Sequence, residues 1–265
     1  MNPQNKYSQL IQAIFEKQYT QGDSEVIFER ADIIEAAEKI GIKVPKNLGD
    51  VVYSFRYRTP LPENIRAIAP EGFYWVIRPA GHARYKFVLI SGKPITPNER
   101  LAETKVPDAT PGIISKYALS DEQALLARVR YNRLIDIFTG LTCYSLQSHL
   151  RTTVDKMGQV ETDELYAGLD KRGAQYVIPV QAKGRNDQIG IVQIEQDLAM
   201  CRSKFPALIC RPIAVKFMDG DLISMFEFEE NEKGISVASE KHYLLVAPES
   251  ITPEDLEKYS RRQSD

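Results

Sequence analysis

The spacing of apolar residues near the start of the chain predicts three helices. Residues 7–19 and residues 31–40 each place apolar side chains at helical intervals, and Gly41 ends the second stretch. Asn47 can cap a third helix, which is ended by Pro60. The expected core-facing residues are Leu10, Ile11, Ile14 and Phe15 in the first helix, Ile33, Ile34, Ala37 and Ile40 in the second, and Leu48, Val51, Val52 and Phe55 in the third.

Short apolar runs predict β-strands beside these helices. Residues 26–28 form one run between the first two helices, while residues 73–77 and 85–90 bracket a turn that contains Gly81. The order of helix, strand, two helices and hairpin resembles that of a winged helix-turn-helix domain. This resemblance implies that the third helix enters the major groove of DNA and that the hairpin lies near the DNA backbone.

Basic residues are concentrated in the same part of the chain. Residues 51–90 contain six basic side chains against two acidic ones, although the whole chain has a formal net charge of -2. Because the global charge gives no attraction to nucleic acid, any DNA contact has to come from a local patch. The resemblance assigns the DNA contacts to Ser54, Arg56, Tyr57 and Arg58 of the third helix and to Arg84 and Lys86 of the hairpin. The alternative is a small interaction domain with arginines on its surface.

The segment that follows predicts a boundary between two domains. Residues 91–114 contain four prolines and little periodicity, as is typical of an irregular connection. We therefore expect a DNA-binding domain at residues 1–90, a linker at residues 91–119 and a second domain at residues 120–265.

The second domain is expected to begin with a helix and continue with strands. Ser120 and Gln123 match a capping box, and apolar periodicity carries the helix to Gly140. Residues 143–153 predict a strand that leads into a hairpin, whose loop lies at residues 168–173. The remaining elements are a helix that begins near Asp187 and strands at residues 207–217 and 222–228.

The two strands of this hairpin carry residue types suited to phosphodiester hydrolysis. That reaction needs a divalent cation, an activated water and a positive charge near the reacting phosphorus. Asp163 can supply the hard oxygen ligand that Mg²⁺ prefers. Gln181 and Lys183 share one strand face, because side chains two residues apart point the same way. Gln181 can then offer a carbonyl oxygen to the metal while Lys183 orients water or stabilises charge, and Glu161 is a second possible metal ligand.

Asp163 together with Gln181-x-Lys183 resembles the PD-(D/E)XK nuclease superfamily, specifically type II restriction endonuclease-like members in which Gln replaces the second acid. The resemblance spans residues from about 120 to 228 and implies an α/β (α+β) fold, with an αβββαβ core and a mixed sheet. It implies catalytic roles for Asp163, Gln181 and Lys183, Mg²⁺ as cofactor, double-stranded DNA as substrate, and a homodimer in a restriction-type defence system. A helix acid, Glu122 or Asp136, could join the metal site.

This chain departs from the family pattern at two positions. Gln181 stands where an acid is usual, and Pro179 is expected to interrupt the strand. Two alternatives therefore stay open: a non-catalytic DNA-binding regulator with a degenerate nuclease fold, and a nuclease that repairs DNA or resolves junctions. His149 is expected to be a packed or hydrogen-bonded residue, not a general base.

Cysteine usage and hydropathy bear on localisation. The three cysteines form no C-x-x-C pair, which argues against a disulfide framework and a zinc ribbon. No apolar run approaches the length of a membrane span, and the N-terminus lacks the apolar core of a signal peptide. We expect a cytoplasmic protein. The sequence also contains no glycine-rich phosphate loop, no G-x-S-x-G and no H-E-x-x-H motif.

Overall fold

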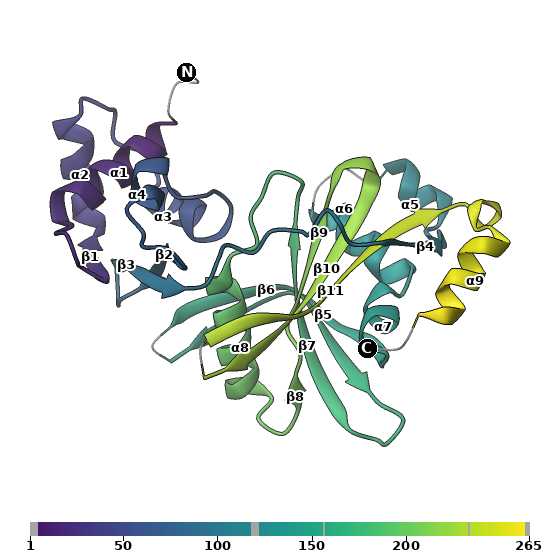
Figure 1. Cartoon of the computed structure of the whole chain (residues 1–265). Helices are drawn as coiled ribbons and strands as arrows, with labels where there is room; N and C mark the ends of the chain where they lie inside the picture. The colour runs from purple at the N-terminus through teal and green to yellow at the C-terminus, as the bar shows by residue number, and fades with distance from the viewer. Residues whose placement is uncertain (1–4, 118–121, 156, 233, 263–265) are drawn as a thin grey trace. The chain divides into compact units, whose positions relative to one another are not determined.

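The chain folds into helices and two β-sheets that belong to two compact units. The computed structural model describes residues 5–117, 122–155, 157–232 and 234–262. One unit comprises Met1–Thr96, Thr152–Val160 and Asp187–Gln196; the other comprises Pro97–Arg151, Glu161–Asn186 and Asp197–Asp265. The expectation of an α/β fold with a mixed sheet is confirmed (Figure 1). No helix in the described part of the chain has the length and apolar character needed to cross a membrane.

The first unit contains the three expected helices, the expected strand and the expected hairpin. Its elements are α1 (Lys6–Gln18), β1 (Glu25–Glu29), α2 (Arg30–Lys39), α3 (Leu48–Tyr57), α4 (Glu63–Ala67), β2 (Phe73–Pro79) and β3 (Arg84–Ser91). Asn47 caps α3, since its side-chain oxygen accepts a hydrogen bond from the Gly49 N–H at 3.1 Å. The strands form an antiparallel sheet in the order β1-β3-β2. The short helix α4 was not predicted.

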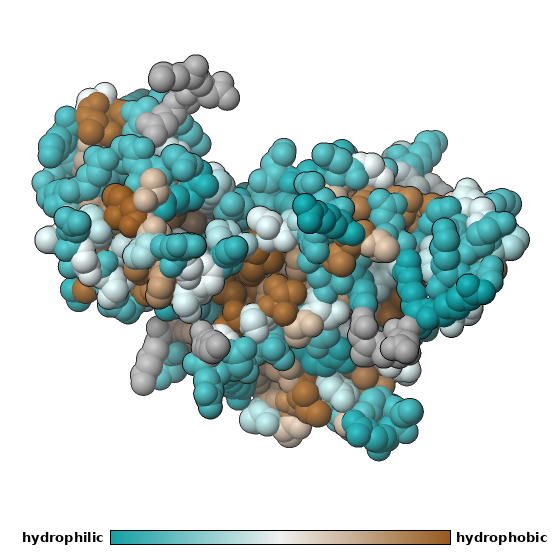
Figure 2. All heavy atoms as spheres, in the orientation of Figure 1, coloured by the Kyte–Doolittle hydropathy of each residue, from teal (hydrophilic) through white to brown (hydrophobic). Residues whose placement is uncertain are grey.

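Aromatic packing fills the core of the first unit. Phe15 of α1 is fully buried and meets Trp75 edge-on at 5.2 Å and Phe87 edge-on at 5.0 Å between ring centroids. Trp75, which is 5% exposed, is therefore a packing residue of this core. Ile34 and Ile40, which were expected in the core, are 39% and 38% exposed. The visible surface of this unit is mostly polar with separate apolar areas (Figure 2).

The second unit is built on a mixed eight-stranded sheet. The remaining elements of the chain are β4 (Glu103–Pro107), α5 (Gly112–Tyr117), α6 (Glu122–Tyr131), α7 (Leu134–Thr139), β5 (Thr142–Val154), β6 (Gly158–Leu169), β7 (Gln175–Lys183), α8 (Ile191–Lys204), β8 (Ile209–Cys210), β9 (Ile213–Phe217), β10 (Leu222–Asn231), β11 (Gly234–Val246) and α9 (Pro253–Arg261), with 3-10 turns at Asp219–Asp221 and Pro248–Ser250. The strand order is β4-β11-β10-β9-β7-β6-β5, with β8 beside β7. β7 runs antiparallel to β6 and parallel to β9. The chain passes from β7 to β9 through α8.

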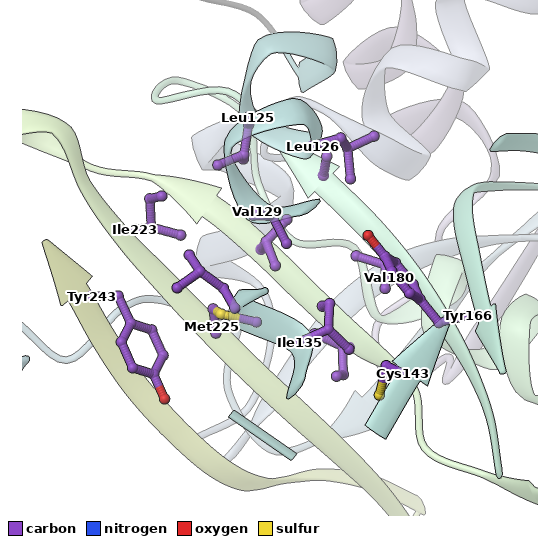
Figure 3. Packing of buried hydrophobic residues seen from close by; sticks show 14 of the residues in the cluster. Leu125, Leu126, Val129, Ile135, Cys143, Tyr166, Val180, Ile223, Met225 and Tyr243 are labelled. Carbon is purple, nitrogen blue, oxygen red and sulfur yellow. The ribbon is translucent and has the colours of Figure 1, made fainter. Parts of the chain in front are cut away.

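Helices α6 and α7 cover one face of this sheet. Leu125 and Val129 of α6 and Ile135 of α7 pack in one buried cluster with strand residues such as Val180 and Met225 (Figure 3). Burying each of these side chains contributes roughly 1.5–3 kcal/mol to stability. β7 is buried from Val177 to Lys183, which identifies it as a central strand covered on both faces.

Several features differ from the sequence-based expectation. The helix predicted to run to Gly140 is divided into α6 and α7, because Arg133 adopts a left-handed conformation with φ of 50°. At this break the Asn132 side chain is buried and accepts a hydrogen bond from the Ala109 N–H at 2.6 Å. Pro179 does not interrupt β7, where it pairs with Leu165. The capping box predicted at Ser120 lies outside the described residues.

The predicted linker is partly regular structure. Within residues 91–119, β4 pairs in parallel with β11, and α5 follows it. The division between the two units falls inside this segment, after Thr96. The first unit also includes Thr152–Val160 and Asp187–Gln196, which the sequence analysis assigned to the second domain. Local patterns give no information on such long-range packing.

Candidate functional site

The three predicted catalytic residues lie on the neighbouring strands β6 and β7. Regular pairing between these strands ends at the pair of Glu164 and Val180, and Asp163 directly precedes Glu164 in the chain. The Asp163 carboxylate then accepts a hydrogen bond from the Ala182 N–H at 2.8 Å, so it binds the backbone between the two other predicted residues. Those residues, Gln181 and Lys183, are only 1% and 5% exposed. The structure therefore brings the predicted residues to the same end of the strand pair.

A further acid, Asp197 of α8, completes this group. The Gln181 amide donates to both carboxylate oxygens of Asp197, at 3.2 and 3.0 Å, and to the Glu161 backbone oxygen at 3.1 Å. The Thr162 hydroxyl also donates to Asp197. We call Thr162, Asp163, Gln181, Lys183 and Asp197 the polar cluster. All its members except Asp163 are buried.

Asp197 was not identified from the sequence, although the helix pattern contains a sign of it. In α8, Ile194, Leu198 and Cys201 follow each other at helical spacing and all are buried. Asp197 stands three residues after Ile194, which places it on the same buried stripe. An acid on a buried stripe needs polar partners, because an unpaired buried charge is strongly destabilising. The position of Asp197 in the helical pattern therefore indicates that its carboxylate is buried among polar partners.

The electrostatic environment of Asp197 favours its protonated form. Burial raises the pKa of Asp197 to about 7, and the nearby charge of Asp163 raises it further, while hydrogen bonds from Thr162 and Gln181 and the charge of Lys183 act in the opposite direction. Near neutral pH this carboxyl group therefore exchanges a proton. A cation bound beside it would favour the ionised form.

The other predicted acids have different partners. The Glu161 carboxylate, a predicted metal ligand, forms an ion pair with Arg151 at 3.0 Å and lies 3.7 Å from a ring nitrogen of His149. Asp136 accepts a hydrogen bond from the Cys143 N–H at 3.0 Å and pairs with Arg133. In the described ranges, no group of three or more His, Cys, Asp or Glu side chains is arranged to hold a metal ion.

A second buried carboxylate, that of Glu164, is fully hydrogen-bonded within the protein and has a structural role. It is 0% exposed and forms an ion pair with Arg130 at 2.6 Å. The hydroxyls of Ser145 and Tyr166 donate to it at 2.9 and 3.0 Å. Burial and this neighbouring carboxylate raise the pKa of Tyr166. Because its oxygens are satisfied by protein donors, Glu164 offers little to a ligand.

The predicted DNA-contacting residues divide into buried and accessible ones. Tyr57 is 8% exposed and its hydroxyl donates to Gln196 at 3.1 Å, so its predicted exposure at the end of α3 is wrong. Burial raises the pKa of Tyr57. Arg56 is partly buried, with its Nε and Nη2 atoms shielded from solvent. Both side chains turn inward because the end of α3 packs within the first unit.

The remaining predicted DNA contacts reach the surface at least in part. Arg58 is exposed and lies over the Tyr53 ring at 5.3 Å, and Ser54 donates to a backbone oxygen of its own helix. On β3, Arg84 and Lys86 pair with acids of β1 at 3.8 and 2.6 Å. Surface ion pairs of this kind are weak, so both cations can exchange their partner for a phosphate.

Comparisons with protein-family models, with curated proteins and with solved structures found no match to this chain. The chemistry of the polar cluster therefore has to be judged from its residues alone. It combines two carboxylates, an amide, a hydroxyl and an ammonium group from β6, β7 and α8. Such a group can bind a cation through oxygen atoms and can hold or transfer a proton at Asp197.

Proposed function

We propose that this protein is a Mg²⁺-dependent endonuclease that hydrolyses phosphodiester bonds of double-stranded DNA. The supporting observation is the meeting of Asp163, Gln181 and Lys183 with Asp197 at one end of β6 and β7. Three sequence positions chosen for their chemistry lie together in the fold, and the fourth residue adds the carboxylate that the sequence motif lacks. The assignment to restriction-type defence rests on the resemblance to PD-(D/E)XK nucleases.

The polar cluster offers oxygen atoms, the type of ligand that a hard divalent cation such as Mg²⁺ prefers. Mg²⁺ uses one or two carboxylates and retains several waters, so Asp163 and Asp197 with the Gln181 amide oxygen would suffice as protein ligands. The two acids lie close enough for the charge of Asp163 to raise the pKa of Asp197. A bound cation would offset this repulsion. The metal would supply a site for phosphate binding and a more acidic water.

The remaining members of the cluster orient these groups. Thr162 and Gln181 both donate hydrogen bonds to the Asp197 carboxylate, which fixes its orientation. The backbone N–H of Ala182 fixes Asp163. Lys183 carries the positive charge of the cluster, and it would stabilise negative charge on the phosphate oxygens during attack. Asp163 is the partly exposed member, so substrate would approach from its side.

The first unit would hold the DNA. Its element order and the sheet order β1-β3-β2 are those expected of a winged helix-turn-helix domain. With Tyr57 buried, the accessible residues for this role are Ser54 of α3, Arg58 directly after α3, and Arg84 and Lys86 of β3. Phosphate contacts would make binding weaken steeply as salt increases. The proposal also includes a homodimer, because two chains with one site each are the simplest way to cut both strands, and a cytoplasmic location.

One observation favours a second candidate function, a non-catalytic DNA-binding regulator. The Gln181 amide is committed to Asp197 and to a backbone oxygen, and both side chains are 1% exposed. A phosphodiester would have to reach groups that the fold has already enclosed and paired. A nuclease-like fold kept for its shape, with the cluster as a buried structural network, would have these properties.

Cleavage assays separate these functions. The purified protein is incubated with unmethylated and methylated phage DNA and with branched DNA, in Mg²⁺ or in EDTA. Lys183→Ala removes the ammonium group, Lys183→Arg restores a positive charge, and Lys171→Ala removes an exposed lysine of the β6–β7 turn as a matched control. Circular dichroism of each variant verifies folding.

Each outcome has a distinct meaning. Discrete Mg²⁺-dependent fragments that Lys183→Ala abolishes and Lys171→Ala leaves intact support a sequence-specific nuclease. Cleavage of branched DNA alone supports a repair or junction-resolving nuclease. Salt-sensitive binding without cleavage of any DNA supports the regulator. Absence of both binding and cleavage contradicts all of these proposals.

A further inference from the structure

A cavity of about 90 Å³ lies within the first unit, separate from the polar cluster. It is enclosed by the end of α3, the loop after it, strand β2, residues 94–95 and residues 188–192. Among the described residues, its lining includes three arginines, Arg56, Arg58 and Arg66, and no acidic side chain. Arg66 pairs outside it with Glu63. The space exceeds that needed by a water molecule several-fold.

Arg56 is a partly buried cationic member of this lining. Its Nε and Nη2 atoms are shielded from solvent, and no described residue accepts a hydrogen bond from either. Its guanidinium carbon lies 4.6 Å from the ring centre of Tyr57, which packs against one side. A shielded N–H group without an acceptor is destabilising, so native proteins seldom retain one without a reason.

The guanidinium edge formed by Nε and Nη2 binds carboxylates at two other arginines of this protein. Arg78 directs its Nε and Nη2 atoms at the two oxygens of Glu195, with Nε at 3.0 Å. Arg211 holds Glu227 with the same two atoms, and Nη2 lies at 2.7 Å. This paired geometry matches two oxygen atoms of one carboxylate or phosphate. Arg56 presents the same edge without a protein partner.

A second polar atom of the lining has the same property. Trp75 is 5% exposed, and its indole N–H finds no acceptor among the described residues. The lining also contains Tyr74, whose pKa is raised to about 12 by burial and by the nearby Glu195 carboxylate, so its hydroxyl stays protonated. Aromatic and apolar walls with a few charged side chains are typical of a small-ligand site.

We propose that this cavity binds an oxyanion, a phosphate or carboxylate group, through the guanidinium group of Arg56, which lines it. A negative group is favoured because three arginines line the cavity. The group can belong to a free small molecule or to the end of a nucleic acid strand. This inference does not depend on the nuclease proposal, since it concerns another unit and needs no cleavage.

Trp75 provides a local measurement, because it is the single tryptophan of the chain and lines the cavity. Its fluorescence is followed while the whole protein is titrated with inorganic phosphate, benzoate, or a dinucleotide with and without a 5′-phosphate. Potassium chloride at matched ionic strength is the reference. The variants are Arg56→Gln, Arg56→Lys and, as a control, Lys39→Gln on α2, where the lysine is exposed.

We expect a saturable change in emission with at least one oxyanion. Arg56→Lys keeps a charge but loses the fork, so it should raise the Kd about tenfold or more, and Arg56→Gln should abolish binding. Lys39→Gln should bind like the original protein. If only the 5′-phosphorylated dinucleotide binds, the source is a nucleic acid end; if phosphate or benzoate suffices, it is a small molecule.

Three results overturn the inference: no saturable change with any of the anions, equal binding by the Arg56 variants, or equal loss in Lys39→Gln. If circular dichroism reveals that the Arg56 variants are unfolded, Val76→Phe takes their place. Val76 lines the cavity and is partly exposed, so a larger side chain there fills the space while the guanidinium group remains. Retained binding in that variant would also overturn the inference.

Discussion

Replacing Asp197 with Asn should make the protein's stability less sensitive to pH. Asn has nearly the same shape, and its side-chain oxygen can accept from Thr162 or Gln181, but it cannot ionise. In the folded protein the pKa of Asp197 is raised to about 7, chiefly by burial, from an ordinary value of 3.8. Between these pH values the unfolded chain loses this proton while the folded chain keeps it. The contribution of Asp197 to the free energy of unfolding is therefore fully present below pH 3.8 and falls as pH rises towards 7.

The magnitude follows from the same two pKa values. Each pH unit within the interval lowers the free energy of unfolding by about 1.4 kcal/mol, and the loss levels off above the folded-state pKa. Between about pH 5 and about pH 8 the original protein should lose roughly 2 to 3 kcal/mol through this group. Asp197→Asn lacks that loss, so its stability relative to the original protein should rise by the same amount.

Urea denaturation in EDTA at both pH values, followed by far-UV circular dichroism, measures the difference. Asp255→Asn is a control of opposite sign, because the Lys105 hydrogen bond lowers the pKa of Asp255 to about 2. The Asp255 carboxylate stabilises the fold above its unfolded-state pKa, and this contribution is lost as pH falls towards 2. Both test pH values lie above that range. Asp255→Asn should therefore be less stable than the original protein, and the difference should be equal at the two pH values. If the free energies of unfolding of Asp197→Asn and the original protein differ equally at both pH values, the pKa of Asp197 is not raised by burial as described.

Three further changes test the packing and the DNA-binding proposal. Leu125→Ala leaves a cavity under α6 and should cost about 2–5 kcal/mol in urea denaturation, whereas Leu256→Ala, at a side chain 59% exposed, should change stability by less than about 0.5 kcal/mol. Comparable losses would contradict the assigned core. Gly190→Ala places a Cβ atom 2.9 Å from a backbone oxygen of the first unit and should cost roughly 1–3 kcal/mol in the same assay; an unchanged midpoint would refute this contact. Arg84→Gln should weaken duplex binding and reduce the salt slope by about 1 in fluorescence anisotropy, and an unchanged slope would argue against the hairpin contact.

The secondary structure was predictable wherever the apolar pattern was strong and local. The faces of α1 and α3 and the hairpin of β2 and β3 follow from spacing alone, and Asn47 marked a helix start that the structure confirms. The break between α6 and α7 was not predictable, because it depends on the buried Asn132 side chain contacting a segment more than twenty residues away. The same holds for β4, whose parallel partner β11 lies near the other end of the chain.

The candidate site was predictable in part for a related reason. Alternation along one strand placed Gln181 and Lys183 on a common face, and Asp163 lies beside them on the neighbouring strand. Asp197 comes from a helix, and its approach depends on how α8 packs on the sheet. Tyr57 was misjudged because a tyrosine at a helix end carries no sign of which neighbours will cover it.

The most direct test of the proposed function is the conversion of supercoiled plasmid DNA by the purified protein in Mg²⁺, compared with the same reaction in EDTA and with Asp163→Asn. The account predicts open-circular or linear DNA in Mg²⁺ alone, and a rate reduced on the order of a hundredfold or more in the variant. Plasmid that stays supercoiled in Mg²⁺, or cleavage that Asp163→Asn leaves unchanged, would contradict a metal-dependent nuclease site at the polar cluster.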